Sequence, residues 1–372
     1  MPSASANLPV APASVPPPRL VAWEVTRQCN LSCLHCRASA ASGPYPDELT
    51  TRECLQVLNQ IREVGQPVII LTGGEPLLRS DIFDLARHGH DLGLRMVMAV
   101  NGTLLDRVTA QKLKNSGIQR ISISLDGASA ESHDFFRQVK GAFAGALKGT
   151  ESAKAVGLEF QINTTVTQYN LNELSKIQEV ALELGAAAHH IFMLVPTGRG
   201  RELSDQTISA GDYEKTLTWL VGRKEELPIS VKATCAPHYY RILREIARKE
   251  GKEITFKSHG LDAVTRGCLG GTGFCFISHR GQVQPCGYLE IDSGHIRKQS
   301  FKEIWENSPV FQALRDRSKY TGKCGRCEYF KVCGGCRARA FEAGGDYLSE
   351  EPLCTYQPRG MKTPQNPSNL LE

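Results

Sequence analysis

The chain has 372 residues, of which 41% are hydrophobic and 22% are charged, and its formal net charge at pH 7 is +5. A chain of this size can bury the core of one large domain together with a smaller one. The positive charge is mild and forms no block, so neither a nucleic acid nor a polybasic membrane surface is indicated as a partner. No apolar run reaches the roughly 18 residues that a membrane span needs.

Cysteine is the most unusual feature of the composition, with 13 residues. Residues 1–18 lack the basic start and the apolar run of a signal peptide, so a secreted disulfide framework is not expected. We therefore expect a cytoplasmic protein whose cysteines bind metal. Residues 1–18 are instead rich in Ala, Pro and Ser and are predicted to form a disordered tail, and residues 361–372 a flexible one.

Short β-rich runs alternate with amphipathic helices from residue 20 to about 220, which indicates βα units around a parallel sheet. A capping box at Thr50 and Glu53, followed by an apolar repeat, predicts a helix that ends at Gly65. Asn170 and Glu173 similarly predict the start of a helix that runs to residue 184. The strands are predicted at residues 20–26, 68–71, 95–100, 120–124, 159–166 and 189–194.

Six βα units are too few to close an eight-stranded barrel, so we expect an open, partial (β/α)6 barrel over residues 19–225. The functional loops of such a barrel follow the carboxyl ends of its strands. Five distinctive loops fall there and are predicted to converge on one rim. They cover residues 29–36, 72–76, 101–102, 124–127 and 196–199.

The first of these loops holds Cys29, Cys33 and Cys36 in the spacing CxxxCxxC. Three thiolates can hold three irons of a [4Fe-4S] cube, whereas an electron carrier closes its site with four cysteines. The remaining iron is then open to a ligand, as in catalytic metal sites generally. Zinc or incidental free thiols are the alternative. Cys54, in the first predicted helix, is expected to be a core residue.

Residues 226–265 are expected to form a helical connector, and residues 266–360 a smaller domain rich in Cys and Gly. Such a segment has few large apolar residues, so metal binding must supply part of its stability. Spacing alone does not name the metal, and zinc remains an alternative to iron. The cysteines of this domain are Cys268, Cys275, Cys286, Cys324, Cys327, Cys333, Cys336 and Cys354.

Together these motifs resemble the radical S-adenosylmethionine (SAM) family. The likeness covers CxxxCxxC, the Gly-Gly-Glu-Pro turn, the SxDG of residues 124–127 and the order of the six units. It implies a [4Fe-4S] cluster on the three thiolates of residues 29–36, with SAM chelating the open iron. It also implies SAM contacts from Gly73, Gly74, Glu75 and Pro76, and by weaker analogy from Ser124, Arg137 and Asn163. Glycine suits such a role because it lets the main chain approach a ligand closely.

The C-terminal cysteines resemble the SPASM extension of radical SAM enzymes, which carries auxiliary iron-sulfur clusters. Family pairing implies one cluster on Cys268, Cys275, Cys286 and Cys336, and another on Cys324, Cys327, Cys333 and Cys354. Two residues separate Cys333 from Cys336 where three are usual. The resemblance therefore leaves open whether there are one or two auxiliary [4Fe-4S] clusters.

Residues 234–240, 273–288 and 324–354 are similar to radical SAM enzymes that modify haem precursors in the sirohaem-derived pathway. The likeness is greatest to the oxidative decarboxylases that convert two propionates of iron-coproporphyrin III to vinyl groups, giving haem b, by means of a 5′-deoxyadenosyl radical. An auxiliary cluster would then accept the released electron, and a flavodoxin or ferredoxin would be the electron donor. A deacetylase of 12,18-didecarboxysirohaem and a SPASM-type peptide or protein maturase are the alternatives.

A tetrapyrrole substrate of this kind carries several carboxylates, which guanidinium groups match with two parallel hydrogen bonds. Candidates for these contacts are Arg27, Arg199, Arg201 and Arg337, although each could equally be a surface or cluster-stabilising charge. His238 and Cys235 are candidates for contact with the porphyrin iron.

Overall fold

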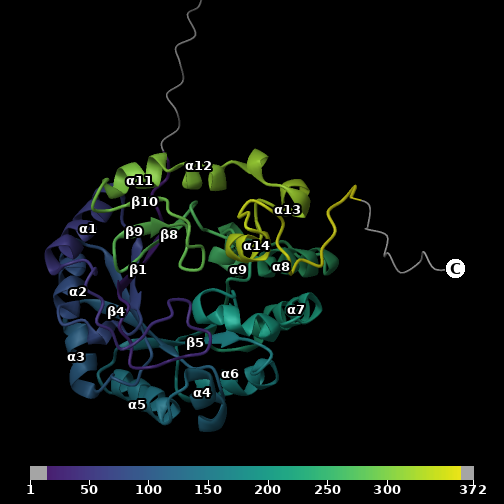
Figure 1. Ribbon diagram of the computed structural model, residues 1–372. Helices are drawn as coiled ribbons and strands as arrows, with labels where there is room; N and C mark the ends of the chain where they lie inside the picture. Colours follow the sequence, from purple (N-terminus) through teal and green to yellow (C-terminus); the bar gives the residue numbers. More distant parts are fainter. Residues whose placement is uncertain (1–14, 362–372) are drawn as a thin grey trace, which may run out of the picture.

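The computed structural model describes residues 15–361 of the chain (Figure 1). Its strands form one mixed sheet in the order β10-β9-β8-β1-β2-β3-β4-β5-β6-β7. Every neighbouring pair from β8 to β7 is parallel, and β9 and β10 add an antiparallel edge. The strands are β1 (Leu20–Thr26), β2 (Val68–Gly73), β3 (Arg95–Val100), β4 (Ile118–Ser124), β5 (Glu159–Val166), β6 (Ala188–Met193), β7 (Ser230–Thr234), β8 (Phe274–Ile277), β9 (Gln282–Gln284) and β10 (Gly294–His295).

Helices surround the sheet on its outer side (Figure 1). Their apolar faces and the outward side chains of the strands form the main core, which includes Cys54, as expected. The helices are α1 (Thr51–Val64), α2 (Ile82–Asp91), α3 (Arg107–Asn115), α4 (Ala130–Arg137), α5 (Ala142–Ala155), α6 (Leu174–Glu183), α7 (Ala210–Glu226), α8 (His238–Lys249), α9 (Phe256–His259), α10 (Leu261–Val264), α11 (Phe301–Asn307), α12 (Pro309–Arg315), α13 (Gly322–Arg326) and α14 (Arg337–Gly344).

The expected open, partial barrel is confirmed, and all six predicted strands are present with small shifts at their ends. The sheet continues beyond them on both sides, because β7 pairs with β6 and β8 pairs with β1. The expectation of a wholly helical connector is wrong at β7. This strand has only Val231 and Ala233 as buried apolar residues, so its sequence signal is weak and pairing with β6 decides its conformation.

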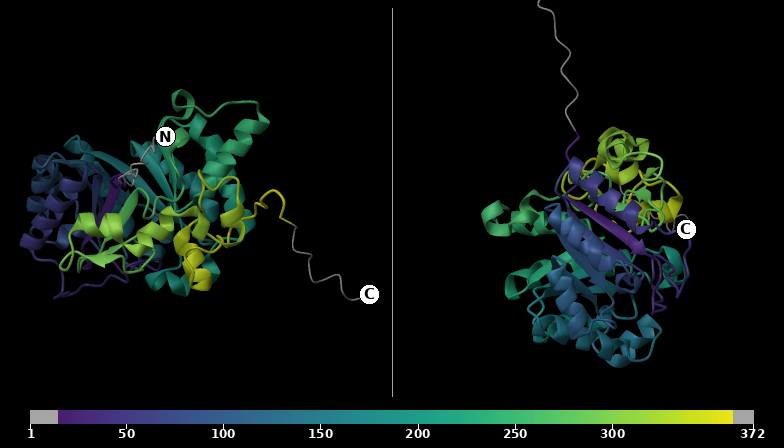
Figure 2. Two further views of the ribbon diagram at one scale, coloured as in Figure 1. Left: turned by 90° about the horizontal axis from the view of Figure 1, so that it is seen from above. Right: turned by 90° about the vertical axis from the view of Figure 1, so that its left-hand side faces the viewer.

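The C-terminal domain is built directly onto the barrel, because β8 extends the sheet beside β1. Figure 2 shows the green-to-yellow C-terminal segment packed beside the purple first strand. Alternate side chains of a strand point to opposite faces. Val21 and Trp23 of β1 join the core under the helices, whereas the buried Glu24 lies on the inner face, where it meets polar groups of the rim.

Two local predictions have different outcomes. The capping box of Thr50 and Glu53 is present at the start of α1. Asn170, however, precedes a 3-10 turn (Leu171–Glu173) rather than α6, and its side chain makes no capping hydrogen bond. Its side chain instead accepts a hydrogen bond from the amide of Thr167 (2.9 Å) and donates one to the carbonyl of Asp126 (2.8 Å). The side chain that the local sequence predicted to cap a helix thus makes a tertiary hydrogen bond instead.

The predicted tails lie mostly outside the described residues. Residues 15–18 are an exception, because the indole N–H of Trp305 donates to the carbonyl of Pro16 (2.9 Å) and Val15 packs on the main core. The predicted disorder is therefore wrong for this short part. Within residues 15–361, no helix is both long enough and apolar enough to cross a membrane.

Candidate iron-sulfur active site

The loop after β1 brings the thiols of Cys29, Cys33 and Cys36 together, packed in one small apolar cluster. Each sulfur accepts one hydrogen bond, and such donors stabilise the thiolate form that binds metal. The donors are the amide of Leu31 to Cys29 (3.4 Å), the guanidinium of Arg137 to Cys33 (3.5 Å) and the amide of Ala40 to Cys36 (3.4 Å). The loop therefore fits a cluster that is held by three thiolates.

Burial opposes ionisation of Cys29 and Cys33 when no metal is bound. It raises the pKa of Cys29 to about 11 and also raises the pKa of Cys33. Metal binding must therefore displace protons from both groups, which couples occupancy of the site to pH.

The loop after β6 holds the cysteine loop in place. The side chain of Arg199 donates to the carbonyls of Cys33 (3.0 Å) and Ala40 (2.7 Å). Its backbone amide donates to the carbonyl of Cys36 (3.0 Å). Gly198 has φ +57°, and a Cβ there would lie 2.2 Å from the carbonyl oxygen of Arg37. Arg199 is therefore a positioning residue for the cysteine loop rather than a free guanidinium for a substrate carboxylate.

Gly74 and Glu75 connect the loop after β2 to the same region. A Cβ on Gly74 would lie 2.2 Å from the carbonyl oxygen of Gln28, and the amide of Glu75 donates to that oxygen (2.7 Å). The fully buried Glu75 carboxylate accepts from the amides of Asn101 (2.7 Å) and Leu77 (3.1 Å). Burial raises its pKa to about 7. Glu75 thus joins three rim loops, with its backbone amide bonded to the loop after β1 and its side chain to the loop after β3. A SAM contact through residues 73–76 stays a prediction.

Asp126, in the SxDG sequence, is a functional candidate that the sequence analysis did not single out. Its carboxylate forms a buried ion pair with Arg137 and accepts from the amide of Thr165 (2.7 Å). Burial alone would raise the pKa of Asp126, but Arg137 and nearby His35 hold it below its usual range. Arg137 is thereby shared between Asp126 and the sulfur of Cys33, and its SAM contact stays a prediction.

His35 lies inside the cysteine loop, stacks on Phe136 at 4.4 Å and approaches Asp126 at 3.8 Å. Burial lowers its pKa to about 3, so its imidazole is neutral at physiological pH. Ser124 is the last residue of β4, and its partner across the sheet is Asn163, which lies within β5. Their predicted SAM contacts stay predictions.

Replacing Arg137 with methionine should lower the free energy of unfolding by about 3–5 kcal/mol, because Asp126 would remain buried without its partner. The substitution also removes the donor to Cys33. Urea denaturation of the anaerobically purified protein measures the change. Arg120→Met is the matched control, since the Arg120–Glu159 ion pair is partly exposed and should contribute about 0–1 kcal/mol. Equal losses in the two variants would contradict a structural role for the buried pair.

The inner face of β1 carries a second buried carboxylate. Glu24 contacts Arg27 (3.0 Å), Arg37 (3.1 Å) and His279 (2.7 Å). Burial would raise its pKa, but these three groups lower it to about 2. Arg37 also lies over the ring of Phe276, 4.4 Å from its centroid. Arg27 and Arg37 therefore have fixed guanidinium groups beside the cysteine loop.

The remaining arginine candidates are already engaged. Arg201 pairs with Glu342 (3.1 Å), which connects the barrel rim to α14. Arg337 is buried and donates to the sulfur of Cys324 (3.3 Å). Its role in the structure is therefore at an auxiliary site, which was one of its two expected roles.

The four cysteines predicted for the second auxiliary cluster line one cavity in the C-terminal domain. They are Cys324, Cys327, Cys333 and Cys354. His238 lines the same cavity, and neither of its ring nitrogens has a hydrogen-bond partner among the described residues. Burial lowers its pKa to about 4. This location places His238 against an auxiliary site, which does not favour contact with a porphyrin iron.

The four cysteines predicted for the first auxiliary cluster do not all lie together. Cys268, Cys286 and Cys336 are neighbours that interact electrostatically, but Cys275 belongs to β8 and has no exposed surface. Its thiol lies in the main core with the helices. The sequence spacing gave no information on which face of β8 Cys275 occupies.

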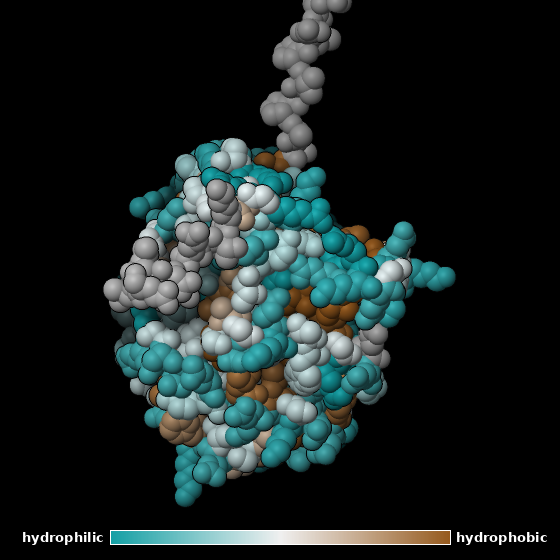
Figure 3. All heavy atoms as spheres, turned by 90° about the vertical axis from the view of Figure 1, so that its right-hand side faces the viewer, coloured by the Kyte–Doolittle hydropathy of each residue, from teal (hydrophilic) through white to brown (hydrophobic). Residues whose placement is uncertain are grey.

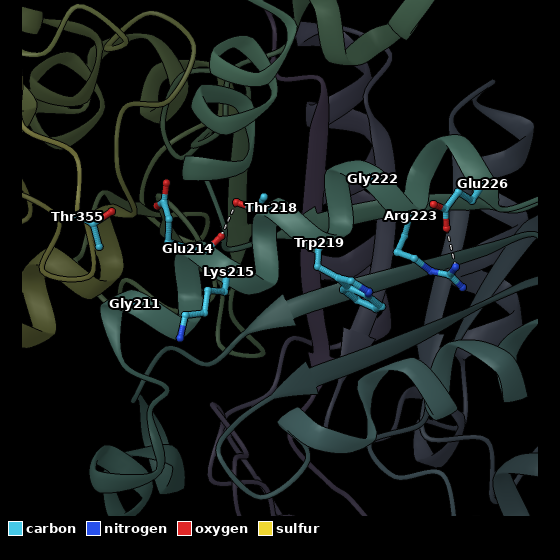
Figure 4. A pocket seen from close by; sticks show the side chains of 9 residues that line it. All are labelled: Gly211, Glu214, Lys215, Thr218, Trp219, Gly222, Arg223, Glu226 and Thr355. Carbon is cyan, nitrogen blue, oxygen red and sulfur yellow. Dashed lines mark hydrogen bonds and ion pairs between the residues drawn. The ribbon is translucent and has the colours of Figure 1, made fainter. Parts of the chain in front are cut away.

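A larger surface groove has no cysteine in its lining, although Thr355, the neighbour of Cys354, is part of it. It runs along α7, and Figure 4 shows the side chains of Glu214, Lys215 and Trp219 along it, with Thr355 at one end. On the side of the molecule drawn in Figure 3, apolar atoms are visible in recesses between hydrophilic side chains. The groove contains no residue of the candidate site, so we assign it no role in the chemistry.

No group of three or more His, Cys, Asp or Glu side chains within residues 15–361 lies close enough to hold a single metal ion. The candidate metal sites are therefore defined by neighbouring thiols and their donors. An open parallel barrel with three thiols at its rim, joined to a domain with further groups of cysteines, defines the class of iron-sulfur enzymes that bind a ligand at an open cluster.

Comparisons with known proteins agree. Residues 23–181 match the radical SAM superfamily, and residues 268–336 match the SPASM iron-sulfur cluster-binding domain. The chain is 55% identical to an AdoMet-dependent heme synthase of Methanosarcina barkeri, over 92% of this chain and 97% of that one. It is 30% identical to an Fe-coproporphyrin III synthase of the same organism, over 90% and 87% of the two chains. SuiB of Streptococcus suis, solved with S-adenosylmethionine, has the same fold with a TM-score of 0.72 at 16% identity, over 92% and 78% of the chains.

The chain therefore belongs to the radical SAM superfamily and, within it, to the SPASM-containing family of the AdoMet-dependent heme synthases. Its radical SAM domain binds a [4Fe-4S] cluster and SAM, and its SPASM domain binds auxiliary iron-sulfur clusters.

Proposed function

We propose that the protein is a haem synthase that decarboxylates two propionates of iron-coproporphyrin III to vinyl groups. The observation that carries this proposal is the 55% identity to a heme synthase over nearly both whole chains. The Fe-coproporphyrin III synthase of the same organism is much less similar, at 30%. By its name that relative forms the compound that the proposed reaction consumes, so the two activities would be successive.

A cluster held by Cys29, Cys33 and Cys36, with SAM bound, would supply hydrogen-atom abstraction from a propionate, and the electron released with CO2 would pass to an auxiliary cluster. The chain must hold the substrate carboxylates near the rim and exclude water. Arg27 and Arg37 are our candidates for the carboxylate contacts, because their side chains are 28% and 17% exposed beside the cysteine loop. Glu24 fixes both of them before substrate arrives, which favours binding of a rigid anion.

Anaerobic incubation with SAM, a strong reductant and iron-coproporphyrin III should yield a product that has lost two CO2 units by mass spectrometry. The protein is first reconstituted with iron and sulfide, and 12,18-didecarboxysirohaem is offered in a parallel reaction. Conversion of only the second compound would replace the proposal with a deacetylase. Formation of 5′-deoxyadenosine with neither tetrapyrrole changed would instead favour a peptide or protein substrate.

A further inference from the structure

Cys235 occupies an unusual position at the carboxyl end of β7, the strand that the sequence analysis missed. It has φ +54°, a conformation that a residue with a side chain rarely adopts. Such strain persists only where the surroundings determine the backbone, and it is often found at functional sites. The loop after β7 thus delivers a thiol to the same edge of the sheet as the other functional loops.

Backbone contacts place Cys235 against the segment that begins at Cys268. A Cβ on Gly267 would lie 2.5 Å from the Cα of Pro237, so the two loops touch without room for a side chain. The amide of Cys268 donates to the carbonyl of Cys333 (3.1 Å), which connects the same segment to the turn that carries Cys336. Three parts of the chain therefore meet at one point.

A buried polar network fixes Cys235 relative to Cys336. The hydroxyl of Tyr213 donates to the carbonyl of Cys235 (3.4 Å) and accepts from Arg339 (2.9 Å). Arg339 pairs with Glu351 (2.9 Å), whose carboxylate accepts from the amide of Cys336 (2.6 Å). This chain of contacts determines how far apart the backbones of the two cysteines are.

The side chains of these cysteines also share their surroundings. Cys235, Cys286 and Cys336 pack in one apolar cluster with Leu289. Burial raises the pKa of Cys235 well above its usual value, and nearby thiols raise it further, namely Cys336, Cys286 and Cys268. Four thiols therefore lie near one another, and four is the number of cysteine ligands that a closed [4Fe-4S] cluster needs.

Cys275 neither packs with the other thiols of this group nor is among the groups that influence the pKa of Cys235. It is paired with Val21 in the sheet and lies with Ile277 in the core under the helices, whereas Phe276 between them faces Arg37 of the cysteine loop. Besides burial, the group that influences its pKa is Arg315 of α12. Cys235, Cys268 and Cys286 are partly exposed, and the buried Cys336 packs with Cys235 and Cys286, whereas Cys275 is enclosed in the main core.

We infer that Cys235 is the fourth thiolate of the first auxiliary cluster, together with Cys268, Cys286 and Cys336, and that Cys275 is not a ligand. This site is then closed and passes electrons without binding substrate. The cluster also connects the last strand of the barrel to the C-terminal domain, so its loss weakens that junction. Cys235 is consequently not available as a ligand of the porphyrin iron.

Two alanine variants with the same chemical change test the inference. Anaerobically reconstituted wild-type protein should contain about 12 irons for three cubanes. Cys235→Ala should either lose about four of them or keep a cluster whose EPR spectrum after reduction differs from that of the wild type. Cys275→Ala should retain the wild-type iron content and spectrum. Far-UV circular dichroism and gel filtration establish that both variants fold.

A serine variant keeps the test informative if Cys235→Ala does not fold. Cys235→Ser retains an oxygen ligand, so the iron content should stay near that of the wild type while the reduction potential of one auxiliary cluster shifts. Unchanged spectra and potentials in both Cys235 variants, or loss of a cluster in Cys275→Ala, would overturn the assignment. These measurements use no tetrapyrrole, so their outcome is independent of the proposed haem synthesis.

Discussion

Replacement of Cys33 by alanine should reduce SAM cleavage to the level of an enzyme-free control. Two thiolates cannot hold the cube that three would hold, and the cluster is the source of the electron for cleavage. The substitution also removes one contact of Arg137, whose guanidinium would keep Asp126 as its partner but lose the sulfur of Cys33. Production of 5′-deoxyadenosine, measured by liquid chromatography in the presence of a strong reductant, gives the result.

Cys54→Ala is the matched control for this experiment. Cys54 is also a fully buried cysteine, but it lies in α1 within the main core, away from the rim. This variant should cleave SAM at the wild-type rate with only a modest loss of stability. Iron analysis adds a second readout, because Cys33→Ala should keep about eight irons if two auxiliary clusters are present and about four if there is one. Retained SAM cleavage in Cys33→Ala would refute the role of this loop.

Gly74→Ala should lower the rate of SAM cleavage by about 100-fold, because a displacement of about 1 Å at a reactive site has effects of this size. The added Cβ would lie 2.2 Å from the carbonyl oxygen of Gln28 and 2.7 Å from that of Arg27. Both atoms belong to the backbone just before Cys29, so the clash cannot be relieved by rotating a side chain. The cysteine loop itself must move.

Gly222→Ala provides the same substitution at a position without neighbours. Gly222 is exposed in α7, and a Cβ there would have no other atom within 4 Å. Alanine should stabilise this helix by about 0.5–1 kcal/mol and leave SAM cleavage unchanged. Equal activity of the two variants would show that the close approach of the loops after β1 and β2 has no catalytic importance.

Local sequence patterns were sufficient to predict much of the barrel. Strands with buried, β-branched side chains and the capping box of Thr50 and Glu53 depend on near neighbours, so they can be recognised without tertiary information. The spacing of Cys29, Cys33 and Cys36 likewise lies within one loop. These three thiols are therefore close together because of their spacing in one short loop, independently of contacts with the rest of the chain.

Local sequence patterns do not predict structure that depends on contacts between distant segments. β7 is weakly apolar and β8, although apolar, has only four residues, and each is a strand because it pairs with an existing strand of the sheet. Local patterns also do not show which of the candidate arginines are available to bind substrate carboxylates. Only the folded chain shows that Arg199 holds the cysteine loop and that Arg337 donates to Cys324.

The sequence by itself thus determined the open barrel, the cluster loop and the presence of a second cysteine-rich domain, since each has a local or family pattern. Only the tertiary structure shows which cysteines of that domain are neighbours. Alternate residues of a strand face opposite sides, and Cys275 of β8 is turned toward the helices. Cys235 lies 33 residues before Cys268 in the sequence, but the loop after β7 brings it to the other three thiols. Spacing along the chain carries no information about either fact.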